Sequence, residues 1–156
     1  MDSLYQSLLS SSQTLLGQLG RLALAEQADF GPFWVLLDDR RAVCVGDEQR
    51  LAELVSDIET LHPFCTQVDD GLEMAICPAD DGVVAIGQLG TARSHCGYVL
   101  LGLPGYTADT AHANAGMIEM LLGQMNLLAD VVEKNNLFHQ EHLSRLSKQS
   151  PLLAER

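Results

Sequence analysis

The chain has 156 residues, of which 47% are apolar and 19% charged, so it can bury the core of one packed domain and general disorder is excluded. Acidic residues outnumber basic residues by 21 to 9, and the formal net charge is −12. This balance disfavours nucleic-acid partners and anionic membrane surfaces, because both are bound through basic protein surface. The first 20 residues lack the pattern of a signal peptide, and the unbroken apolar runs are too short to span a membrane, so we expect a cytoplasmic protein.

The N-terminal third predicts a helix followed by a β-hairpin. A first helix is expected over residues 1–27, because leucines recur there at helical spacing. The pair Gly31-Pro32 ends this section. Phe33–Leu37 and Ala42–Gly46 are short runs rich in aromatic and β-branched residues on either side of a polar turn, which predicts two antiparallel strands.

The middle of the chain predicts a short helix and a three-stranded meander. Asp47 begins the helix, which is expected to run to about Leu61 and to end at His62-Pro63. The segment Phe64–Gly71 is consistent with either a short strand or a loop over a ligand. Three apolar runs with short turns between them then predict antiparallel strands at Leu72–Cys77, Val83–Leu89 and Tyr98–Leu103.

A long helix is predicted over residues 109–147, with Thr107 or Asp109 as its cap. Such a helix is about 60 Å long, which exceeds the diameter of about 30–35 Å expected for a domain of this size. Its distal half must therefore pack on something else. A coiled-coil seam predicts that this is the same helix of a second copy, and its members are Leu122, Met125, Ala129, Val132, Asn136, His139, Leu143 and Leu146.

Two readings of the end of this helix are open. Asn136 and His139 are polar seam positions that would fix register in a dimer, or the helix frays after Asn136 and both are exposed. The run at 148–151 is expected to stop the helix, because it contains Pro151. Residues 1–147 are then one domain, and residues 148–156 are a linker to a further domain.

The order helix, hairpin, helix, meander and long helix resembles the GAF fold, a relative of PAS. The resemblance rests on Phe33–Val45, on the strand Gly97–Leu103 and on the helix Ala115–His142. It implies an α+β fold in which a central antiparallel sheet carries the N- and C-terminal helices on one face and a small-molecule pocket on the other. It also implies a sensory domain that homodimerises and passes a ligand or redox signal to a downstream effector, such as a histidine kinase, a diguanylate cyclase or a transcriptional activator.

The sequence departs from GAF domains of known ligand. The Asn-Lys-Phe-Asp-Glu motif of the cyclic-nucleotide domains is absent, and His95-Cys96 reverses the order used for bilin attachment. No cofactor is therefore assigned. Candidate pocket residues are chosen by their place in the presumed fold, and they are Phe33, Trp34, Cys65, Met74, His95 and Tyr98.

Catalytic and metal-binding patterns are missing from the sequence. The four cysteines form no Cys-x-x-Cys pair, and no nucleophile elbow or phosphate-binding loop occurs. His139 and His142 share a helix face but lack an evident third metal ligand. We therefore expect a non-catalytic domain. The alternatives are a stand-alone interaction or scaffold protein whose long helix binds a different partner, and a small redox enzyme that uses Cys65, Cys77 or Cys96.

Overall fold

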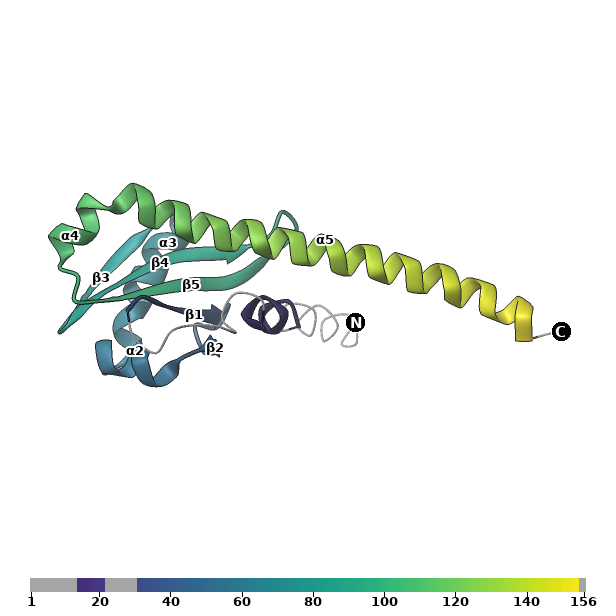
Figure 1. Cartoon of the computed structure of the whole chain (residues 1–156), viewed down its shortest axis with the longest axis horizontal. Coiled ribbons are helices and arrows are strands. Elements are labelled where there is room, and N and C mark those ends of the chain that lie inside the picture. Colours follow the sequence, from purple (N-terminus) through teal and green to yellow (C-terminus); the bar gives the residue numbers. More distant parts are fainter. Residues whose placement is uncertain (1–13, 22–30, 155–156) are drawn as a thin grey trace.

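The structure is a computed structural model that describes residues 14–21 and 31–154. Within the predicted first helix, residues 14–21 are helical, and the rest of the predicted range lies outside the described residues. The fold is α+β and has three layers, with a sheet between two groups of helices (Figure 1).

The sheet has five antiparallel strands in the order β2-β1-β5-β4-β3. The predicted hairpin and the predicted meander are both confirmed, although the strand predicted at Leu72–Cys77 begins at Ala75 and continues to Ala79. The strands are β1 (Phe33–Asp38), β2 (Val43–Gly46), β3 (Ala75–Ala79), β4 (Gly82–Gly90) and β5 (His95–Pro104).

Helices cover both faces of this sheet, which explains why its strands are continuous apolar runs. In β1, Phe33 and Val35 contact one helical layer, whereas Trp34 and Leu36 contact the other. Successive strand side chains point to opposite faces, and a strand buried on both faces is therefore apolar at every position. The central strand β5 follows the same rule, and its residues 96–103 are all buried.

One helical layer consists of α2 (Glu48–Leu54), the 3-10 helix η1 (Ile58–Leu61) and α3 (His62–Asp69). The continuous helix predicted from Asp47 is broken at Val55, whose backbone is extended and whose side chain is buried. The prediction of a strand or loop over Phe64–Gly71 is wrong, because most of that segment is helix α3. The proline at position 63 was expected to end a helix, but it lies in the first turn of α3, where its fixed φ suits a helix start.

The other layer consists of helical residues 14–21, α4 (Ala108–Ala113) and α5 (Ala115–Ala154). Thr107 caps α4, as predicted, by accepting a hydrogen bond from the backbone N–H of Thr110. The single helix expected from 109 is interrupted at Asn114. The stop predicted at 148–151 is also wrong: α5 runs through Pro151 to Ala154. A proline inside a helix removes one backbone donor and crowds the carbonyl four residues earlier, and here it lies in the last turn, with three helical residues after it.

Helix α5 lies along the sheet with its first half and projects well beyond the sheet with its second half (Figure 1). Its 40 residues correspond to about 60 Å at 1.5 Å per residue. Leu15, Leu16 and Leu19 pack in the same apolar cluster as Ile118 and Leu122, so the first and last described helices share one face of the sheet.

Candidate functional site

The six predicted pocket residues do not gather at one place. Phe33, Cys65 and Tyr98 are buried between the sheet and the α2–α3 layer. Two others, Trp34 and Met74, pack on the opposite face with the α5 layer, and His95 is exposed. The ring of His95 does contact Tyr98 edge-on, with 5.5 Å between ring centroids.

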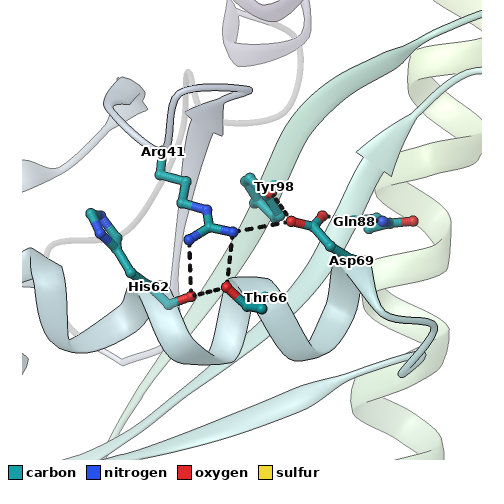
Figure 2. A network of polar contacts seen from close by, with 6 residues as sticks. All are labelled: Arg41, His62, Thr66, Asp69, Gln88 and Tyr98. Atoms are coloured by element: carbon teal, nitrogen blue, oxygen red, sulfur yellow. Dashed lines mark hydrogen bonds and ion pairs between the residues drawn. The ribbon is translucent and has the colours of Figure 1, made fainter.

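A polar network does surround Tyr98 at one end of the sheet (Figure 2). Arg41 has a left-handed backbone, with φ of 67°, in the β1–β2 turn, and its side chain reaches α3. There its guanidinium donates hydrogen bonds to the carbonyl of His62 at 3.2 Å, to the hydroxyl of Thr66 at 3.0 Å and to the Asp69 carboxylate at 3.1 Å. The same Asp69 oxygen accepts a hydrogen bond of 2.7 Å from the Tyr98 hydroxyl. Three elements are thus joined at Asp69.

These contacts keep Asp69 ionised. Partial burial raises the pKa of its carboxyl, but the donors on Tyr98, Arg41 and Gln88 outweigh burial and hold that pKa below its ordinary value. The pKa of Tyr98 is raised by burial and by the neighbouring carboxylate. The network therefore contains a fixed ion pair and a protonated phenol, and neither group is poised for proton transfer at neutral pH.

Three further hydrogen bonds connect Asp69 to helix α5. The side chain of Gln88 in β4 donates to Asp69 at 3.4 Å. The backbone carbonyl of Gln88 accepts a hydrogen bond of 2.9 Å from Asn126 of α5, which also accepts from the Gly90 N–H at 2.8 Å. The α3 layer and α5 lie on opposite faces of the sheet, so this chain of contacts crosses it.

The β4–β5 loop is bound to α5 next to Asn126. Glu133 accepts a hydrogen bond of 2.7 Å from the Thr91 hydroxyl, and Asp130 accepts one of 2.9 Å from the Ala92 N–H. Asn126, Asp130 and Glu133 are separated by four and three residues and therefore share one face of the helix. This polar face sets the position of α5 against the loop.

The residues of the predicted dimer seam differ in burial, and only the first four are buried. Leu122, Met125, Ala129 and Val132 are buried against the protein's own sheet, together with Ile118; these five residues are called the inner seam below. Asn136 is half-buried and donates to Gln18 at 2.7 Å. His139, Leu143 and Leu146 are exposed.

A second apolar row lies on α5 away from the sheet. We call it the outer stripe, and its members, which are between 47% and 72% exposed, are Met117, Met120, Leu127, Val131 and Phe138. With Gln124 and Lys134 included, their spacings alternate between three and four, as in a heptad repeat. The sequence analysis does not predict this row, although its spacing is visible in the sequence, because the inner row alone is assigned to the dimer seam.

A groove of about 370 Å³ adjoins the outer stripe at Val131. It lies between helical residues 14–21 and α5, and its lining residues are Gln18, Arg21, Val131, Val132, Asn135 and Asn136. The groove therefore borders the outer stripe and shares Val131 with it.

Helix α5 is also long and apolar enough to cross a membrane, with a mean hydropathy of 1.3 over its most apolar window between Ala115 and Leu146. In this fold its inner seam is covered by the sheet, and its polar face binds the β4–β5 loop. The sheet covers the inner apolar face of α5, and the outer stripe is exposed.

Three of the four thiols, those of Cys65, Cys77 and Cys96, are buried and have the properties of packed side chains. Burial raises the pKa of Cys65 to about 11 and also raises the pKa values of Cys77 and Cys96. A nucleophilic cysteine requires the opposite shift. Among the described residues, no group of three or more His, Cys, Asp or Glu side chains is placed to hold a metal ion.

No protein-family model, curated protein or solved structure matches this chain. The outer stripe and the network from Arg41 to Asn126 are the features of the described residues that point to a function.

Proposed function

We propose that this protein is a non-catalytic, GAF-like regulatory domain that forms a homodimer through α5 and passes a ligand or redox signal along that helix to a downstream effector. The GAF-like assignment is supported by the central antiparallel sheet and by the terminal helices on one of its faces. The raised pKa values of the buried thiols favour this role over a cysteine-based enzyme.

The observation that carries the proposal is the outer stripe. Soluble monomers rarely expose large contiguous apolar patches, and those they do expose are commonly binding sites. The stripe has the heptad spacing of a helix-pairing seam, and it lies on a helix whose other apolar face is already covered. A second α5 offers a surface of the same shape and spacing.

The network from Arg41 to Asn126 supplies a route for the signal. A ligand that binds the α2–α3 layer would shift α3, and with it the carboxylate of Asp69. The Gln88 contacts would carry this shift to Asn126 and so to the position of α5. Such coupling requires that the ligand favour one of two arrangements of the helix.

We further propose that the protein is cytoplasmic and that α5 remains in water or in the dimer rather than in lipid. Insertion of α5 would remove its inner seam from the sheet and expose the core of the domain. The net charge of −12 also opposes approach to anionic lipid headgroups.

The dimer is tested by placing a charge in the stripe. Val131→Glu puts a carboxylate at the middle of the outer stripe, where the side chain is 62% exposed in the single chain, so the fold of the monomer is preserved. We expect wild-type protein to sediment as a dimer at about 100 µM and the variant to sediment as a monomer, because a buried unpaired charge costs several kcal/mol.

The matched control is Gln140→Glu, which adds the same charge to an exposed position of α5 off the stripe. It should leave the dimer intact. Wild-type protein that is monomeric at this concentration, while its circular dichroism spectrum shows that α5 is folded, contradicts the homodimer. That result favours a scaffold whose α5 binds a different protein.

A further inference from the structure

We propose that the two copies pair in an antiparallel orientation, outer stripe against outer stripe, with the centre of the interface at the level of Ala129 along each helix. This inference rests on the proposed dimer and specifies its geometry. The distal half of each α5 then covers the proximal half of the partner's α5.

The polar residues within the outer stripe distinguish the two orientations. The heptad positions between Met117 and Phe138 include Gln124 and Lys134, and the next position is Glu141. In a two-stranded pair, seam residues of the two helices meet in layers. A polar residue is tolerated there only if its partner in the layer satisfies it.

A parallel, in-register pair brings like charges together. Each layer then contains two copies of one residue, so Lys134 meets Lys134 of the other copy and Glu141 meets its own counterpart. Like charges that face each other across a helix interface are destabilising. Both unfavourable layers would flank Phe138, which is 72% exposed in the single chain and is the largest apolar side chain of the stripe.

In an antiparallel pair centred at the level of Ala129, each layer combines residues of similar polarity. Its layers are Val131 with the partner's Leu127, Phe138 with the partner's Met120, and Lys134 with the partner's Gln124. Apolar residues then meet apolar residues, and the Lys134 ammonium meets an amide oxygen. Glu141 reaches the partner's Met117 at the outer end of the contact, where its carboxylate stays in water.

Other antiparallel registers match less well. A shift of seven residues in one direction places Lys134 against Met117 and Gln124 against Leu127. The shift in the other direction places Lys134 against Val131. Each of these registers removes an apolar contact and desolvates an ammonium or amide group without a partner, which is costly.

The shape of the chain agrees with the antiparallel arrangement. Inner-seam burial ends at Val132, and all described residues of α5 from Phe138 to Leu146 are exposed. The helix therefore projects past its own sheet (Figure 1). Antiparallel pairing lays residues 133–146 of this projecting half along the partner's residues 112–125 and leaves the two sheets on the outside, because each inner seam faces away from the contact.

One substitution separates the two orientations by the sign of its effect. Gln124→Glu creates two Glu–Lys layers in the antiparallel dimer, one for each copy. In the parallel dimer it creates a Glu–Glu layer and leaves Lys134 facing Lys134. We expect the dissociation constant to fall by about threefold to tenfold, as for two exposed ion pairs. A rise in the dissociation constant overturns the antiparallel pairing.

A distance measurement then tests the register. Cys44 is exposed and the other three cysteines are buried, so Cys44→Ser removes the accessible native thiol from the full chain. Nitroxide labels on Gln140→Cys in this background, which leaves the stripe intact, should be about 33 Å apart along the axis in the antiparallel dimer, because 22 residues separate them, and level with each other in a parallel one. A mixture of labelled Glu119→Cys and Gln140→Cys chains should show a shorter distance.

A short distance in Gln140→Cys alone overturns the orientation and leaves the dimer standing. Absence of any dipolar coupling, together with a single-chain mass, overturns the dimer itself. Flotation of the unlabelled protein with neutral phosphatidylcholine vesicles would show that the stripe binds lipid and would overturn both proposals.

Discussion

Asp69 receives hydrogen bonds from Arg41 in the β1–β2 turn, Gln88 in β4 and Tyr98 in β5. Its pKa is lowered in the folded state because these donors outweigh the effect of burial. The folded protein therefore binds fewer protons here than the unfolded chain does. The stabilisation is present at neutral pH and is lost as the pH falls below about 3.9 and through the lower folded pKa.

Asp69→Asn should therefore lower stability at pH 7 and reduce the loss of stability on acidification. Urea unfolding at several pH values between 3 and 7 measures both effects, and the variant and wild-type curves should converge at the acid end. Asp70→Asn is the matched control, since Asp70 is a neighbouring exposed carboxylate outside the network. Curves for Asp69→Asn and wild type that stay parallel down to pH 3 would mean that the carboxylate contributes no proton-linked stability.

At the scale of elements, the β4–β5 loop and α5 are connected through Asn126, which accepts from the Gly90 N–H and donates to the Gln88 carbonyl. Asn126→Ala leaves both backbone groups without this partner. We expect a loss of about 1–3 kcal/mol in unfolding free energy, which is typical when polar groups lose their hydrogen bonds.

Hydrogen exchange locates the effect of Asn126→Ala. Amides of residues 90–94 should exchange faster in the variant, because the loop is then held to α5 only through Asp130 and Glu133. Amides of the α2–α3 layer should be unchanged. Glu119→Ala, at an exposed α5 position, serves as the control, and in this variant the amides of residues 90–94 should exchange as slowly as in wild type.

The elements differ in how well they could be predicted from the sequence. Strands β1, β4 and β5 have apolar runs bounded by turn residues, and such runs form strands wherever both faces are covered. Helix α3 was missed because Pro63 is compatible with either a helix end or a helix start, and only the packing of Cys65 and Val68 on the sheet decides between them.

The long helix shows a different limit. Its inner seam and outer stripe have the same three-four spacing and differ in phase, so the sequence predicts that α5 has apolar neighbours but not which row meets which neighbour. The first four predicted dimer residues pack on the sheet instead. Network partners such as Arg41 and Asp69 lie 28 positions apart, and no local pattern indicates that the β1–β2 turn and α3 meet.

At the scale of the whole molecule, charge and apolar surface act against each other. Each chain carries a net charge of −12, so two copies repel at distances beyond their contact surface. The proposed interface is an apolar stripe with Lys–Gln layers, in which the ammonium meets an uncharged amide, so the interface contains no ion pair for salt to weaken. Salt does screen the long-range repulsion, since the Debye length falls from about 10 Å at 0.1 M to about 3 Å at 1 M.

We therefore expect the dimer to become tighter as salt increases. Sedimentation equilibrium should give a dissociation constant about twofold to tenfold lower at 500 mM than at 50 mM sodium chloride, because screening removes repulsion between bodies of like charge. The Val131→Glu variant should remain monomeric at both concentrations, which ties the salt effect to the stripe. Association that weakens with added salt would instead indicate that surface ion pairs hold the two copies together, and the outer stripe would then not be the interface.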